Sequence, residues 1–124
     1  MGEGVLVDTD VLIDYVRGRR ELPAGPHYVS EVTVYEFIRG TKDPSRAKEL
    51  LEQEFIVVYH DNEVLERAAE IWRALRKEGA LIDDRDLLIG SVAIAKGLPL
   101  LTGNAKHFER LGKFGLVLAH GKAR

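Results

Sequence analysis

The sequence predicts an α/β fold, with a mainly parallel central sheet of four to five strands flanked by helices. Short apolar runs alternate along the chain with segments whose apolar residues recur at three- and four-residue steps. Strands that alternate with helices need crossover connections, and these produce parallel sheets covered by helices. The chain has 124 residues, 45% of them apolar, and no visible repeat or linker. We therefore expect a single domain over residues 1–124.

The first elements follow from apolar runs and capping residues. The run at 5–7 ends at Asp8 and predicts a buried strand, and apolar residues at helical spacing then continue to Gly18. A second short strand is expected at 28–29. Ser30 can cap the helix that follows it.

The middle of the chain alternates in the same way. Asp43 followed by a proline begins a helix, and the β-branched and aromatic run at 55–59 predicts a strand. Asp61 then opens a longer amphipathic helix that closes at Gly79.

The next helix begins at Asp83 or Asp84 and closes at Gly97. It is apolar nearly all round, so we expect it to be deeply buried. The last expected elements are a strand at 98–101, a short helix around 107–111 and a strand at 116–118.

Composition excludes several classes of protein. The chain has no cysteine, which excludes a disulfide scaffold, a thiolate zinc site and a cysteine nucleophile. No export signal is visible, and the longest uncharged apolar stretch, 87–95, is far shorter than the ~20 residues of a membrane helix. We expect a soluble, cytoplasmic protein. With 18 Lys and Arg against 20 Asp and Glu, any nucleic acid must meet a local basic surface or a bound cation.

Three acids stand on apolar elements. Asp8 directly follows the first strand, Glu36 is flanked by bulky residues on a helix, and Asp86 begins the most hydrophobic segment of the chain. Each has a structural alternative: Asp8 and Asp86 as caps or first-turn acids, and Glu36 as a surface residue paired with Arg39 or Lys42.

Together these acids predict a metal site. Ligands of parallel α/β sheets collect beyond the carboxyl ends of the strands, where Asp8 and the turn at 102–104 both fall. Two charges ~4 Å apart repel by about 4 kcal/mol at an effective dielectric near 20, so clustered carboxylates need protons or a cation. Mg²⁺ or Mn²⁺ prefers oxygen ligands and promotes phosphodiester hydrolysis.

Three segments carry a family resemblance: Val-Asp-Thr-Asp-Val-Leu-Ile-Asp-Tyr (7–15), Tyr-Glu-Phe-Ile-Arg-Gly (35–40) and Asp-Leu-Leu-Ile-Gly-Ser-Val-Ala-Ile-Ala-Lys-Gly-Leu-Pro-Leu-Leu-Thr-Gly-Asn-Ala-Lys-His-Phe (86–108). In order and spacing they resemble the PIN-domain family, and within it the VapC-type toxins of toxin–antitoxin pairs. The first and third motifs together are specific, whereas the glutamate motif alone is weak.

The resemblance implies a three-layer α/β/α fold of PIN type and an endoribonuclease that uses Mg²⁺ or Mn²⁺ and a water nucleophile. It also implies an RNA substrate, a small antitoxin partner and a homodimer. By position, Asp8, Glu36 and Asp86 match the catalytic, metal-binding acids of the family.

Five further residues form a second tier. Asn104 lies in the turn where many family members carry a fourth acid, which leaves a site with fewer direct ligands, a water-mediated role for Asn104, or compensation by Asp84. Thr9 and Thr102 match positions where a hydroxyl orients a carboxylate or water, or simply bonds the backbone at a turn. Asp10 ranks below the three core acids, since Asn is common there in the family.

Basic residues near the first two motifs are candidates to guide the RNA backbone, although a solvated charged face is an equal alternative. The basic candidates are Arg17, Arg19, Arg20, Arg39 and Lys42.

His107 is the one titratable base near the 102–104 turn, and we favour a structural or exposed role over general-base chemistry.

Two other functions fit parts of the sequence. A haloacid-dehalogenase-like phosphatase also places Asp-x-Asp after its first strand, but Leu12 stands where that class has threonine. A PIN-like binding module whose acids no longer form a working site is the stronger alternative, and direct metal binding distinguishes it from the enzyme.

Overall fold

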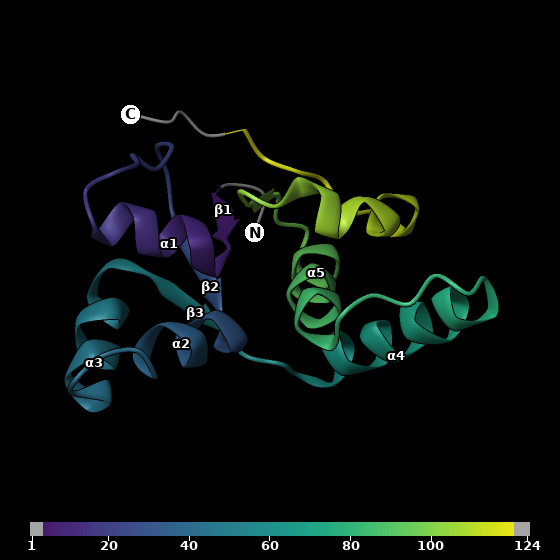
Figure 1. Cartoon of the computed structure of the whole chain (residues 1–124), viewed down its shortest axis with the longest axis horizontal. Coiled ribbons are helices and arrows are strands. Elements are labelled where there is room, and N and C mark those ends of the chain that lie inside the picture. Colours follow the sequence, from purple (N-terminus) through teal and green to yellow (C-terminus); the bar gives the residue numbers. More distant parts are fainter. Residues whose placement is uncertain (1–3, 121–124) are drawn as a thin grey trace.

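The computed structural model describes residues 4–120 as a parallel sheet between two layers of helices (Figure 1). The elements in chain order are β1 (Val5–Val7), α1 (Thr9–Val16), β2 (His27–Ser30), α2 (Glu31–Ile38), α3 (Pro44–Glu54), β3 (Ile56–Val58), α4 (Asn62–Lys77), α5 (Asp84–Lys96), β4 (Leu100–Leu101) and the 3₁₀ helix η1 (Ala105–Phe114).

All four strands are parallel and lie in the order β3-β2-β1-β4. In the centre, Leu6 of β1 pairs with Tyr28 of β2 on one side and Leu100 of β4 on the other. The strands that come first and last in the chain, β1 and β4, are therefore neighbours in the sheet, and this brings Asp8 and the 102–104 turn to the same edge as expected. The predicted α/β class and its parallel sheet are confirmed.

Side chains alternate across β1 and join two separate cores. Leu6 packs with residues of α4 and η1 such as Ile71 and Leu111. Its neighbour Val7 points to the opposite face and packs with Leu12 of α1 and Leu51 of α3. Because strand side chains alternate between faces, the sheet needs both helical layers, and Figure 1 shows α1, α2 and α3 on one side and α4, α5 and η1 on the other.

Capping residues that the sequence analysis identified define the ends of several helices. The side chain of Ser30 accepts a hydrogen bond from Thr33 N at 3.2 Å, and that of Asp61 accepts one from Val64 N at 3.0 Å. Gly97 closes α5 in the left-handed conformation at φ 65°, which glycine adopts without steric cost. α5 is buried along most of its length, as its apolar sequence predicted.

The late strands are shorter than expected. The predicted strand at 98–101 is reduced to two residues beginning at Leu100, because Pro99 has no N–H to donate to a neighbouring strand. The predicted strand at 116–118 is only an isolated parallel bridge between Leu118 and Leu100. The described sheet thus has four strands, the lower of the two expected numbers.

Two other boundaries differ from the predictions. Phe55 is the C-cap of α3, so β3 begins one residue later than expected and spans only three residues. The short helix expected around 107–111 is a longer 3₁₀ segment, η1. Within residues 4–120 no helix is both long and apolar enough to cross a membrane.

Candidate active site

Asp8 is fully buried at the carboxyl end of β1. Its backbone N donates to Leu101 O of β4 at 2.9 Å, and its Oδ1 accepts from Thr9 N at 2.7 Å as the N-cap of α1. Asp8 therefore does cap a helix, which was the structural alternative to a catalytic role for this residue. Capping uses only part of the carboxylate, because both of its oxygens also accept hydrogen bonds from side chains.

Glu36 comes to the same place from α2. Thr9 Oγ1 donates to Glu36 Oε1 at 2.6 Å and lies 3.1 Å from Thr33 Oγ1. Thr33 is itself held by Ser30, which caps α2. A row of buried hydroxyl groups thus fixes one side of the Glu36 carboxylate.

Asp86 enters from the first turn of α5 and is buried. His107 Nδ1 of η1 lies 3.6 Å from Asp86 Oδ2, while the His107 side chain is 60% exposed. Asp83 is the N-cap of α5 but makes no capping hydrogen bond with its side chain. Asp84 is exposed, and in the described chain no hydrogen bond or ion pair links it to the three acids.

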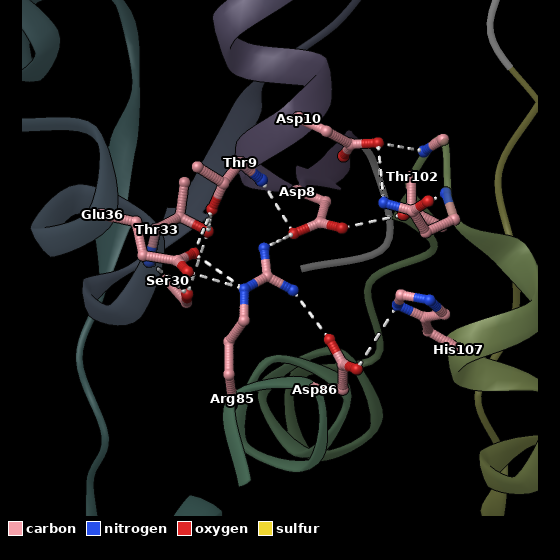
Figure 2. A network of polar contacts seen from close by, with 12 residues as sticks. Asp8, Thr9, Asp10, Ser30, Thr33, Glu36, Arg85, Asp86, Thr102 and His107 are labelled. Atoms are coloured by element: carbon pink, nitrogen blue, oxygen red, sulfur yellow. Dashed lines mark hydrogen bonds and ion pairs between the residues drawn. The ribbon is translucent and has the colours of Figure 1, made fainter. Parts of the chain in front are cut away.

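The guanidinium of Arg85 lies at the centre of the cluster (Figure 2). Each of its three nitrogens faces a different carboxylate. Nη2 donates to Asp8 Oδ1 at 2.8 Å, Nη1 donates to Asp86 Oδ1 at 2.7 Å, and Nε contacts both oxygens of Glu36 at 2.8 and 2.9 Å. The three acids predicted from sequence are brought together, and a cation of the protein itself bridges them.

The electrostatics of this cluster favour a positive charge. Burial alone would lower the pKa of Arg85, but its hydrogen bonds to Glu36 and the negative charge of Asp8 raise that pKa above its ordinary value. One guanidinium opposite three carboxylates still leaves two formal negative charges uncompensated. The cluster is thus built to hold positive charge.

The donor set fits a hard divalent cation. All three side chains offer carboxylate oxygens, the ligands that Mg²⁺ and Mn²⁺ prefer, and Arg85 already occupies the position of a cation among them. Within residues 4–120, however, no group of three or more acids or histidines is already spaced to hold a metal ion. Binding a metal here therefore requires Arg85 to move.

The turn at 102–104 supports the cluster from the other side. Thr102 Oγ1 donates to Asp8 Oδ2 at 2.8 Å and accepts from Asn104 N at 3.0 Å. Asp10 Oδ2 accepts from Gly103 N at 2.9 Å and from Asn104 Nδ2 at 3.4 Å. Burial, and the negative charge of Asp8, raise the pKa of Asp10. Among the described residues, the side chain of Asn104 thus hydrogen-bonds to Asp10, and no hydrogen bond joins it to the three core acids.

A cleft of about 680 Å³ opens beside the cluster between α5 and η1. None of the basic residues proposed from sequence lines this cleft; Arg39, for example, stacks over the Tyr35 ring at 5.1 Å. The residues that line it are Leu81, Ile82, Asp83, Arg85, Asp86, Asn104, Lys106, His107, Glu109 and Arg110.

Sequence reasoning missed Arg85 and Lys106. A basic residue directly before a predicted ligand acid was the available signal for Arg85, but the sequence does not tell which way its side chain points. Lys106 stands within the third motif and was not singled out. Its position on η1 beside the cleft becomes visible only in the folded chain.

Fold and site together define a parallel α/β protein with an acidic cluster at the carboxyl edge of its sheet, next to an open cleft. A PIN-domain family model matches residues 5–114. The chain therefore belongs to the PIN-domain family.

Relatives and solved structures agree with this assignment. The chain is 46% identical over 116 residues to Ribonuclease VapC1 of Methanocaldococcus jannaschii, covering 92% of this chain and 85% of that protein. VapBC-1 from nontypeable Haemophilus influenzae matches with a TM-score of 0.77 at 25% identity, over 94% of this chain and 97% of that one. A toxin–antitoxin complex from Klebsiella pneumoniae matches with a TM-score of 0.71 at 29% identity, over 95% and 99%.

Proposed function

We propose that this chain is an endoribonuclease that uses Mg²⁺ or Mn²⁺ to hydrolyse RNA phosphodiester bonds, and that it is the toxin of a toxin–antitoxin pair. The observation that carries the proposal is the convergence of Asp8, Glu36 and Asp86 on one cation position at the carboxyl edge of the sheet. The similarity to Ribonuclease VapC1 supports RNA as the substrate. Membership of the PIN-domain family removes the dehalogenase-like alternative.

When bound, a divalent cation supplies positive charge against phosphate oxygens and lowers the pKa of water. The residues of the chain position the groups around it. Thr102 and the amide of Thr9 fix the Asp8 carboxylate, and the hydroxyl of Thr9 fixes Glu36. Asp86 faces the cleft through which a phosphate group would approach. This preorganisation means that the acids need little rearrangement during hydrolysis.

The partner proposal rests on relatives. The matched structures include toxin–antitoxin complexes, and we propose a small antitoxin that covers the cleft beside the cluster. We also propose a homodimer. Light scattering of the purified chain, alone and with its antitoxin, tests both assemblies, and a monomer at micromolar concentration would contradict the homodimer.

The first experiment is cleavage of a mixed pool of structured RNA by purified protein with Mg²⁺, with Mn²⁺ and with a chelator. We expect cleavage only with the metals. The double variant Asp8→Asn, Asp86→Asn should lose it, because neutral amides cannot replace two anionic ligands of a hard cation. The matched control is Glu66→Gln, Glu70→Gln, which neutralises two exposed acids on α4.

Equal activity of the wild type and the Asp8→Asn, Asp86→Asn variant, with both folded and free of antitoxin, would contradict this function. Absence of cleavage in both, together with absence of Mn²⁺ binding, would favour the PIN-like binding module. Thermal unfolding supplies the binding measurement, because a ligand that binds only the folded state raises Tm by mass action.

A further inference from the structure

The contacts of Arg85 point to a role beyond that of a structural ion pair. Its side chain touches all three core acids, and its three nitrogens are directed at one carboxylate each. Its partners come from the end of β1, from α2 and from α5, so a single side chain gathers three separate elements. By contrast, the exposed ion pairs of Arg46 with Glu49 and of Lys48 with Glu52 each join neighbouring turns of one helix.

The guanidinium and a metal ion cannot share this position. Mg²⁺ binds oxygen at about 2.1 Å in a near-octahedral shell, whereas the Arg85 nitrogens hold the same carboxylate oxygens at 2.7 to 2.9 Å around a planar group. Arg85 is already bonded to one oxygen of Asp8, one of Asp86 and both of Glu36, so an ion bound between the three acids would compete with it. This agrees with the absence of a ready metal group among the described residues.

Arg85 has a way out of the cluster. Its side chain is 27% exposed, whereas that of Asp8 is fully buried. It also lines the cleft beside the cluster. An arginine side chain on the first turn of a helix can change rotamer into such a cleft without moving the backbone.

We propose that Arg85 is a built-in counter-ion that holds Asp8, Glu36 and Asp86 together in the metal-free protein, competes with the divalent cation for them, and is displaced into the cleft when the cation binds. This inference rests on the proposed metal-dependent function. Displacement places the guanidinium, a group suited to phosphate oxygens, on the side from which RNA approaches. Arg85 is thus a positioning residue before metal binding and a phosphate contact after it.

The test is calorimetric titration of the metal-free wild type, Arg85→Gln and Arg46→Gln with Mn²⁺. We expect Arg85→Gln to bind Mn²⁺ about tenfold or more tightly than the wild type, because no charge-assisted bonds need to break first. Without metal, Arg85→Gln should have a lower Tm than the wild type, since three carboxylates then lie together without a cation. Arg46→Gln should match the wild type in both measurements.

A second measurement uses only the wild type. The ¹⁵N–¹H signal of Arg85 Nε should shift when diamagnetic Mg²⁺ is added, because Nε leaves Glu36, and it should move toward the position of a solvated arginine. An unshifted signal at saturating Mg²⁺ would overturn the proposal even if Arg85→Gln failed to fold.

The outcomes separate the two proposals. If wild type and Arg85→Gln bind Mn²⁺ equally, or the variant binds more weakly, the counter-ion role is wrong while the metal-dependent nuclease stands. If neither protein binds Mn²⁺, both proposals are overturned. Tighter binding by Arg85→Gln with a lower metal-free Tm supports the counter-ion.

Discussion

At the scale of single residues, the cluster depends on hydroxyl groups as much as on charges. Glu36 is held on one side by Arg85 and on the other by Thr9. If Arg85 leaves on metal binding, Thr9 remains as the described contact that fixes the Glu36 carboxylate. Hydrogen-bond partners of metal ligands typically tune metal affinity 10- to 100-fold.

Thr9→Val tests this support. The substitution keeps the side-chain shape and removes the donor 2.6 Å from Glu36 Oε1. We expect about tenfold weaker Mn²⁺ binding by calorimetry, because the Glu36 carboxylate is no longer oriented. The control is Thr41→Val, whose hydroxyl donates to Ile38 O outside the cluster. Equal affinities of the two variants would rule out the orienting role.

The sequence predicted which acids meet but not what lies between them. Asp8, Glu36 and Asp86 were identifiable because each is a costly charge on an apolar element. The position of Arg85 was not, since the direction of a long side chain depends on the rotamer and on partners distant in sequence. Asn104 shows the same limit: its amide reaches Asp10, a contact that only the folded turn defines.

At the scale of elements, the C-terminal end of α5 is tied to the N-terminal end of α4. Lys96 donates to Asp61 Oδ2 at 2.5 Å and to Glu63 Oε1 at 3.1 Å. The pKa of Asp61 is lowered, mainly by the hydrogen bond that its carboxylate accepts from Lys96 and to a smaller extent by the one that it accepts from Val64 N. The negative side chain also lies at a helix N-terminus, where the helix dipole favours it.

This contact predicts a pH dependence. A carboxylate with a lowered folded-state pKa adds stability above its unfolded pKa of about 3.9 and loses that stability as the pH falls through the folded value. Asp61→Asn, which keeps the capping oxygen, should lower Tm at pH 7 and match the wild type near pH 2. Asp43→Asn, at a cap without a lysine partner, serves as the control. A Tm difference that stays constant with pH would contradict the charge effect.

The packing of η1 on α5 predicts a second effect. A Cβ at Gly90 would collide with Cδ1 of Leu111, which is fully buried, whereas a Cβ at Gly112 meets open space. Alanine gains up to about 1 kcal/mol in helix propensity, but overpacking costs about 1–3 kcal/mol. Gly90→Ala should lower the free energy of unfolding by about 1–2 kcal/mol in urea. Gly112→Ala should not, and equal stabilities would show that Leu111 moves freely.

The type of every helix and of the first four strands was predictable, whereas strand length was not, and the strand expected at 116–118 is only an isolated bridge. Periodicity and caps located every main helix, because they are local properties of the chain. The late strands were overestimated because pairing depends on neighbours that local sequence does not show. The bridge at Leu118 has one partner, Leu100, at the edge of the sheet.

At the scale of the whole molecule, the cleft beside the cluster distinguishes the basic residues that could contact RNA from those that lie elsewhere. Lys106 lines it, whereas the candidates after α1 and α2 do not. Since the net charge is −2, the proposed binding of RNA depends on local positive charge and on the proposed cation.

Lys106→Gln should therefore weaken RNA cleavage, with kcat/KM falling about threefold to tenfold at low salt. The slope of log K for RNA binding against log salt concentration should also become shallower, by the amount expected for the loss of about one phosphate contact. Lys77→Gln on the exposed end of α4 is the control. The same salt dependence for both variants would show that RNA does not follow the cleft.

The separation of the cluster residues along the chain also sets when the site can form. Asp8 lies 77 residues before Arg85 and 94 residues before Thr102. A chain still being synthesised cannot complete the bonds around Asp8 until β4 has left the ribosome and paired with β1. The order of synthesis therefore sets the order of assembly: the strand that carries Asp8 is made first, and its carboxylate stays without the bond from Thr102 until β4 has been added to the sheet.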